Sequence, residues 1–169
     1  VITWDSLDID NGDTVLFNQL NNQSIALNKV TGPLAQSTID GILQSNGHVW
    51  ILNPVGVAFG ANANVDVGAL LATTADIDTA TFMATDPTTG TFTFTDAGGT
   101  GAIVVANGAD LDTTGLLALV APMVSNAGDL TSSHGDVLLG GAEAFRSKFA
   151  STARNNGTAF NELLVTDFI

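Results

Sequence analysis

The sequence predicts an all-β fold of the solenoid type, in which coils of about 20 residues follow one another along an axis. Three observations support this prediction. Short apolar runs separated by Asn, Gly or Pro fill the stretch from Val49 to Thr74, which is typical of strands and not of a helix. Similar segments recur along the chain. The acidic residues are mostly Asp, which favours turns, whereas Glu favours helices.

The repeat is clearest in the second half of the chain, where VVANGADLDTTGLLALV aligns with MVSNAGDLTSSHGDVLLG. Asp110 falls on Asp129 in this alignment, and Asn107 falls on Asn126 at the same offset. Two or three short strands fit each copy, so coils are expected to stack at the ordinary strand spacing of about 4.8 Å. Asn107 and Asn126 are then expected to form a ladder of stacked side-chain amides.

Glycine marks one corner of the predicted coil. It opens the apolar runs at Gly47, Gly68, Gly115 and Gly135, and the members of the first and last pairs are about one coil apart. Gly and Asn accept the left-handed backbone angles that tight corners need. The strands therefore stop at regular intervals because the coil must turn.

Alternate residues of a strand point to opposite faces, so Val49 and Ile51 are expected on one face and Trp50 and Leu52 on the other. The aromatic side chains could line a stripe that binds a sugar or a protein, although alternating aromatics more often cover or cap a core. We expect the covering role for this set: Trp4, Trp50, Phe82, Phe92 and Phe94.

Two regions depart from the repeat within a single predicted domain that spans residues 1–169. Slightly more than two coils of sequence separate Gly68 from Gly115. Within them, TFMATDPTTGTFTFTDAGG, residues 81–99, alternates Thr and Phe around a Pro-Thr-Thr-Gly turn and predicts an extra-helical β-hairpin. The segment 142–169 loses the period, so a helix or irregular structure is expected there.

The composition narrows the possible partners. Hydrophobic residues make up 45% of the chain and charged residues 12%, which argues against disorder. The net charge is −13 with four basic residues, so no basic surface is available for nucleic acid. The apolar runs are too short to span a membrane, and the absence of Cys suits an exported chain. Val1 is not an initiator Met, which indicates a mature protein or an excised piece.

The order of segments from Trp4 to Phe145 resembles the two-partner secretion domain, the N-terminal haemagglutination-activity domain of filamentous-haemagglutinin-like exoproteins. The resemblance runs through WDSLDIDNGDTVLFNQL, GHVWILNPVGVAFGANANVDVG and VVANGADLDTTGLLALVAPMVSNAGDL. It implies a right-handed parallel β-helix with a small extra-helical sheet. It also implies that POTRA domains of an outer-membrane barrel transporter recognise the chain in the periplasm. The chain then folds at the surface of a Gram-negative bacterium.

The resemblance singles out one motif. The family pattern Asn-Pro-Asn-Gly-[Ile/Val/Leu] falls on Asn53, Pro54, Val55, Gly56 and Val57, with Val55 in place of the second Asn. Pro and Gly are kept, so the turn is expected to form, and we associate Asn53, Pro54 and Gly56 with partner recognition. Relatives carry about a coil of sequence before the segment that matches Trp4. A trimmed start or a differently capped first coil is therefore expected.

Candidate metal sites are weak in this sequence. The stretch DIDNGD, Asp8–Asp13, resembles the start of a 12-residue calcium-binding loop. However, Gly12 and Gln19 occupy loop positions 5 and 12, where ligands are needed, so a solvated turn is expected. Asp76 with Asp78 and Asp110 with Asp112 could each project from one face of a strand and bind calcium, as in β-helical pectin lyases. We expect solvated turn edges at both pairs, and no metal or cofactor.

Catalytic motifs are equally weak. His48 and His134 each adjoin a strand start, and we expect them at the surface or at corners, because no Ser-His-Asp pattern accompanies them. Lys29 is the sole basic residue of the predicted solenoid, which argues against a lyase that needs Lys or Arg as its base. No catalytic residue is therefore assigned.

The leading hypothesis is a secretion-targeting and fold-nucleating module of a large exoprotein, and not an enzyme. Two alternatives stay open. A β-helical carbohydrate-active enzyme predicts an Asp/Lys/Arg cluster on one sheet face. A stand-alone surface adhesin predicts that the extruded segment 81–99 binds a host or cell-surface receptor.

Overall fold

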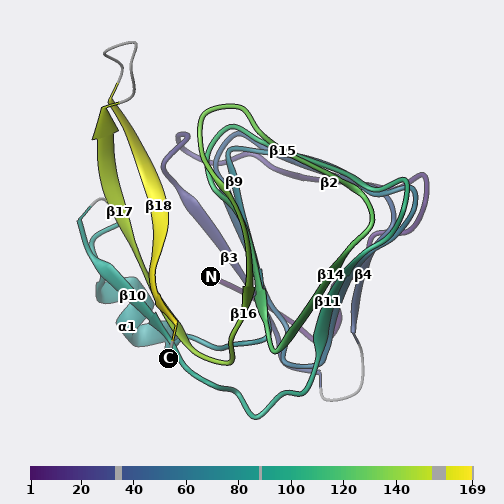
Figure 1. The fold of residues 1–169 in the computed structure, drawn as a ribbon, viewed down its shortest axis with the longest axis horizontal. Helices are drawn as coiled ribbons and strands as arrows, with labels where there is room; N and C mark the ends of the chain where they lie inside the picture. The colour runs from purple at the N-terminus through teal and green to yellow at the C-terminus, as the bar shows by residue number, and fades with distance from the viewer. Residues whose placement is uncertain (33–35, 88, 154–158, 169) are drawn as a thin grey trace.

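The chain winds as a parallel β-helix with a triangular cross-section in the computed structural model (Figure 1). The structure describes residues 1–32, 36–87, 89–153 and 159–168, with the backbone alone for 148–153 and 159–167. Three parallel sheets form the walls of the triangle. Sheet A contains, in spatial order, β1 (Ile2–Trp4), β3 (Ile25–Val30), β6 (His48–Leu52), β9 (Ala69–Thr73), β13 (Leu117–Ala121) and β16 (Val137–Gly141). Sheet B contains β4 (Ser37–Ile39), β7 (Gly56–Phe59), β11 (Ala102–Val105) and β14 (Met123–Asn126). Sheet C contains β2 (Thr14–Phe17), β5 (Ile42–Ser45), β8 (Asn64–Val67), β12 (Asp110–Thr113) and β15 (Asp129–Ser132).

Each coil passes from sheet A to sheet B to sheet C and returns to sheet A one level higher. The first coil has no full strand in sheet B, and a single bridge between Ile9 and Ile39 takes its place. The Asp8–Asp13 stretch around this bridge is a turn closed by the Asp13 amide, which donates to the Asp10 carbonyl at 2.9 Å. The prediction of stacked coils is confirmed, and the turn expected at Asp8–Asp13 is present.

The glycine corner joins sheet C to sheet A. The Gly68 amide donates to the Gly47 carbonyl at 2.9 Å, and the Gly115 amide donates to the Gly68 carbonyl at 2.7 Å. A Cβ on Gly135 would overlap the backbone of Gly115. The four glycines therefore form one column, in which neighbouring backbones approach too closely for a side chain.

The pairing of sheet C confirms one repeat prediction, and the pairing of sheet B overturns another. Asp110 lies opposite Asp129, as the alignment predicts. In sheet B, however, Asn126 lies opposite Val105, two positions before Asn107. The corner between sheets B and C is shorter in the later coil, so Asn107 and Asn126 are out of register. The predicted amide ladder is wrong.

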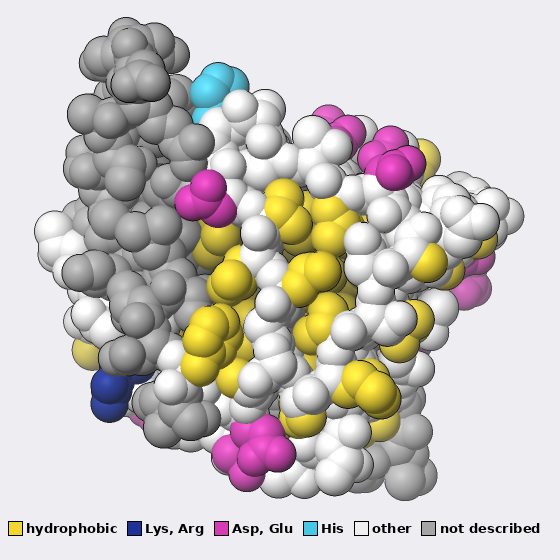
Figure 2. Space-filling view, in the orientation of Figure 1, with side chains coloured by type: hydrophobic (Ala, Val, Ile, Leu, Met, Phe, Trp, Pro, Cys, Tyr) yellow, Lys and Arg dark blue, Asp and Glu magenta, His cyan; other side chains and the backbone are white. Residues whose placement is uncertain are grey.

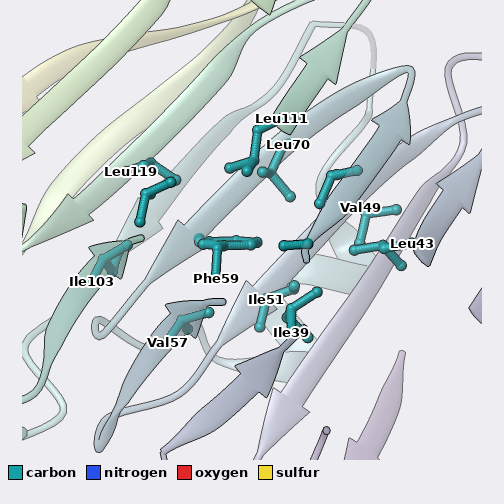
Figure 3. Packing of buried hydrophobic residues seen from close by; sticks show 14 of the residues in the cluster. Ile39, Leu43, Val49, Ile51, Val57, Phe59, Leu70, Ile103, Leu111 and Leu119 are labelled. Carbon is teal, nitrogen blue, oxygen red and sulfur yellow. The ribbon is translucent and has the colours of Figure 1, made fainter. Parts of the chain in front are cut away.

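The interior of the triangle is a continuous apolar core. Inward residues of all three sheets pack in layers along the axis (Figure 3), among them Val49, Ile51, Phe59, Leu70 and Leu111. Val49 and Ile51 face this interior core, as predicted. Because each layer rests on the one before, burial of these side chains favours regular stacking.

The segment between β9 and β11 differs from the prediction. Leu70 in β9 lies directly beside Leu117 in β13, so the interval is one coil with a long excursion and not two coils. The expected hairpin at 81–99 is wrong. The excursion forms helix α1 (Thr79–Ala84) and one strand, β10 (Thr91–Phe94). Asp78 begins the helix, because its carboxylate accepts the amide of Thr81 at 2.8 Å.

The segment after Gly141 also differs from the prediction. It forms β17 (Phe145–Ala153) and β18 (Ala159–Phe168), an antiparallel pair, where a helix or irregular structure was expected. Positions 154–158 and 169 of that segment lie outside the described residues. Strand β10 pairs antiparallel with β17, which gives a three-stranded outer sheet in the order β10-β17-β18. An extra-helical sheet is thus present, with a different composition from the one expected.

The outer sheet and α1 cover the outer face of sheet A and create a second apolar core. This outer core contains Trp50 and Leu52, as the alternation of β6 predicts, together with Phe82, Phe92 and Phe94. Trp50 is fully buried and makes edge contacts with Phe82 and Phe92 at centroid distances of 5.6 and 5.0 Å. The prediction that the aromatics cover a core is confirmed for these four aromatic residues, which explains why β6 is buried on both faces. Trp4 is partly buried and packs against the interior core instead.

The last coil presents apolar side chains along the axis. Its inward positions Val137 and Leu139 are 43% and 48% exposed, whereas their neighbours Leu117 and Leu119 are fully buried. In the view of Figure 2, apolar side chains gather near the centre of the face. The described part of the chain contains no helix with the length and hydropathy of a membrane span.

Candidate functional site

Asn53, Pro54 and Gly56, the three residues that we associate with partner recognition from the sequence, lie together in one turn at the passage from β6 to β7. The Gly56 amide donates to the Asn53 carbonyl at 2.9 Å and closes a β-turn. The Val55 amide donates to the Asn53 side-chain oxygen at 2.9 Å, which adds an Asx turn. The turn therefore forms although Val55 replaces the family's second Asn.

Asn53 ties this turn to two neighbouring segments. Its backbone amide donates to the Thr73 carbonyl at 3.0 Å in the next coil of sheet A. Its side-chain amide donates to Ser37 Oγ at 3.0 Å, and both side chains are buried. Buried polar groups need such partners, so Asn53 is a structural residue of the folded chain. Ser37 was not recognised in the sequence, because nothing local marks it as a partner of Asn53.

Gly56 is required by the backbone at this point. Its φ is +120°, a region that side chains disfavour. A Cβ at this position would lie 2.6 Å from the Ala102 carbonyl oxygen of the next coil. Gly56 therefore allows β7 to begin immediately after the turn and pair with β11.

The returning end of the excursion covers the turn. A Cβ on Gly99 would overlap the Pro54 carbonyl, and a Cβ on Gly101 would overlap the backbone of Val55. Pro54 and Val55 are left partly exposed and line a cleft of about 780 Å³ together with residues 97–101. The glycines in TDAGGTG were a signal of this close approach, but the sequence did not show which segment they meet.

Lys29 and Asp76 also line the cleft. The Lys29 ammonium contacts the Asp76 carboxylate at 2.8 Å and donates to the Ile77 carbonyl at 2.7 Å and to Thr79 Oγ1 at 3.4 Å. Its side chain is 14% exposed. The three donors of the ammonium each face a protein acceptor, so Lys29 anchors the start of the excursion.

The two Asp pairs considered as ligands have separate positions and roles. Asp76 pairs with Lys29, whereas Asp78 caps α1, and hydrogen bonds from the Thr81 hydroxyl and amide lower the pKa of Asp78. Asp110 and Asp112 point outward from sheet C. Among the described residues, no group of three or more His, Cys, Asp or Glu side chains is arranged to hold a metal ion.

The two histidines differ in their surroundings. His134 lies exposed at a corner and its ring contacts the Ser133 hydroxyl at 3.0 Å. His48 also follows a corner but is buried, and burial lowers its pKa to about 4. The expectation of a surface or corner position holds at His134, and at His48 only the corner holds.

A family model described as "TPS secretion domain" matches residues 1–164. Two proteins of Haemophilus influenzae, one of them from strain Rd, are each 43% identical over 72 residues, and both are named heme/hemopexin-binding protein. Each match covers 43% of this chain and 8% of the relative.

Proposed function

The chain belongs to the TPS secretion domain family, and we propose that it directs a longer exported protein to an outer-membrane transporter by binding the transporter's periplasmic POTRA domains. Membership of the family implies a secretion-targeting module of a two-partner secretion exoprotein, and an outer-membrane transporter as its partner. The match over residues 1–164 carries the proposal. We further propose that recognition takes place in the periplasm, that Asn53, Pro54 and Gly56 take part in it, and that the chain folds at the cell surface.

We propose that POTRA domains bind the chain while it is extended. In the folded chain, the Asn53 side chain and its partner Ser37 are buried, and residues 97–101 cover the turn. A partner that binds the Asn53 side chain therefore has to do so before this coil folds. An extended chain offers free backbone amides and carbonyls, which suit addition to the edge of a POTRA sheet.

Folding of the chain then competes with its binding to the POTRA domains and so favours its release. The same backbone groups that would pair with a POTRA strand pair with neighbouring coils in the β-helix, for example between β6 and β9. Formation of the interior core competes with the bound state and favours folding once the chain has left the transporter. The first coils supply a surface on which later ones stack, which is the proposed nucleating role.

A binding experiment with the full chain tests this proposal. The chain is kept unfolded in urea and diluted over immobilised POTRA domains of a candidate transporter, and the folded chain is tested in parallel. The proposal expects binding of the unfolded chain and much weaker binding of the folded one. Failure of the unfolded chain to bind the POTRA domains of the transporter that exports it would refute the proposal.

Two variants separate recognition from folding. Asn28 is a matched control for Asn53, since it is equally buried and donates to the Trp50 carbonyl at 3.2 Å but lies outside the motif. If the POTRA domains contact the Asn53 side chain directly, Asn53→Ala weakens binding of the unfolded chain and Asn28→Ala does not. Equal binding by both variants would assign Asn53 to the turn alone.

A further inference from the structure

We propose that the outer sheet and α1 form a cover that opens and closes as its own cooperative unit, while the β-helix beneath stays wound. This inference does not rest on the proposed role in secretion, because it concerns the folded chain alone. Opening of the cover would expose an apolar sheet face centred on Trp50.

Two apolar cores share sheet A as a common wall. Inward side chains of β6, such as Val49, belong to the interior core, and outward ones, such as Trp50, belong to the outer core. The interior core is bounded by sheets A, B and C, and among the side chains that the structure describes it contains none from α1, β10 or β17. The outer core needs sheet A as its floor. The β-helix can thus exist without the cover, whereas the cover cannot pack without the β-helix.

The hydrogen-bond ladders are separated in the same way. In the described part of the chain, β10 pairs in its sheet with β17, and β17 pairs with β18, and neither joins sheets A, B or C. Only the isolated bridge between Asp76 and Thr95 adds a backbone link at the base of the cover. Detaching the cover breaks apolar contacts and leaves the ladders of the β-helix intact.

One aromatic pair joins the two strands β10 and β17 within the outer core. Phe94 of β10 and Phe145 of β17 stack with ring centroids 4.3 Å apart and planes inclined by 8°. Both rings are fully buried. Phe94 also lies 5.6 Å from Trp50, so the pair joins the two strands of the cover to the outer face of sheet A.

Lys29 fixes where the cover is attached. Its ammonium binds the Ile77 carbonyl and the Asp76 carboxylate where the chain leaves the β-helix, immediately before α1. Residues 97–101 lie against the Asn53–Gly56 turn where the chain returns. The part of the cover between these two points, α1 and β10, is therefore tethered at both ends, and β17 is joined to it by pairing with β10. Regions held by few ladders and a single apolar face are the ones that open below the global unfolding free energy.

Hydrogen exchange of the unmodified full chain, followed by mass spectrometry at increasing urea, tests the inference. The expected result is that amides of β10 and β17 lose protection at lower urea than those of β6, β9 and β13. Loss of protection by all five strands at the same urea concentration, with the same dependence, would overturn it.

Two phenylalanine variants provide a matched comparison. Phe59→Ala removes a ring from the interior core, which is intact whether the cover is open or closed. It should raise the exchange of β6, β9 and β13 roughly a hundredfold or more and leave the opening of β10 and β17 at its wild-type value. Phe145→Ala removes an equally buried ring that is packed only in the closed cover, so it should raise exchange in both regions by similar factors. A similar increase in the two regions for Phe59→Ala would contradict the inference, and Phe59→Leu serves if the alanine variant does not fold.

Discussion

The side-chain amide of Asn53 donates to the Ser37 hydroxyl at 3.0 Å, and the two residues are 0% and 1% exposed. This contact joins the turn after β6 to the strand that lies beneath β7 in sheet B. It is a buried polar contact of the residue that we propose to take part in recognition. Loss of Asn53 therefore affects the folded chain whatever its part in secretion.

The first prediction concerns the energetic value of this contact. Asn53→Ala should lower the free energy of unfolding by about 2 kcal/mol, because Ser37 and the Val55 amide each lose a buried or partly buried partner. Urea denaturation followed by circular dichroism measures the change. Asn64→Ala, on the exposed face of sheet C, should change stability by less than about 0.5 kcal/mol. A similar loss in the two variants would contradict the prediction.

The second prediction concerns the backbone of Gly56. Gly56→Ala should destabilise the chain by at least about 2 kcal/mol, because the φ of +120° disfavours a side chain and the new Cβ would meet Ala102. Gly98 is the control, since its φ is also positive but no atom lies within 4 Å of an added Cβ. Gly98→Ala should therefore lose only about 1 kcal/mol. Thermal or urea unfolding of the two variants makes the comparison, and equal losses would show that the contact with Ala102 is unimportant.

The third prediction is a pH dependence set by His48. Its pKa is lowered to about 4 by burial, so between that value and the ordinary value near 6.5 the unfolded chain binds a proton that the folded chain does not. The free energy of unfolding should thus fall by up to about 3 kcal/mol as the pH drops from 6.5 to 4. Urea denaturation at several pH values, in wild type and in His48→Gln, isolates this contribution from that of the carboxylates. The exposed His134→Gln variant should keep the wild-type slope, and a wild-type slope in His48→Gln would refute the assignment.

The fourth prediction concerns the anchor of the cover. Lys29→Met should lower stability by about 1 to 2 kcal/mol, because the Ile77 carbonyl loses a charged donor. Asp76→Asn should lose less, about 0.5 kcal/mol, since the carboxylate is 44% exposed and water screens its attraction to Lys29. Hydrogen exchange of α1 in the two variants checks the order. A larger effect of Asp76→Asn would mean that the ion pair is the main attachment.

The periodic part of the fold could be predicted because it obeys local rules. Gly47 and Gly68 occupy equivalent corners of successive coils, where a side chain would meet the neighbouring backbone, so their spacing is visible in the sequence. The alternation of Val49 and Trp50 followed equally from strand geometry. The prediction of an amide ladder between Asn107 and Asn126 was wrong because the corner between sheets B and C changes length from coil to coil. Alignment of the repeated sequences alone does not reveal such a change.

The outer sheet could not be predicted in detail because its partners are distant in the sequence. The alternation of Phe92 and Phe94 correctly indicated a strand, but its partner is β17 and not the preceding segment. Asp78 and Thr81 form an N-cap that marks a helix start, which the Thr/Phe alternation obscured. At the candidate site, the Asn53–Gly56 turn was predicted from its residues. Its contacts with Ser37 and with residues 97–101 arise only from stacking of the coils.

The glycine column has a consequence for how this architecture tolerates change. It fixes the register at the corner between sheets C and A, so the corner between sheets A and B can lengthen without disturbing the winding. The chain leaves the helix after Thr74 and returns at Ala102, directly beside Gly56, with a whole subdomain in between. Splicing an epitope or a reporter peptide into this excursion should preserve the scaffold, whereas a methyl group added to Gly47, Gly68 or Gly135 would collide with neighbouring backbone.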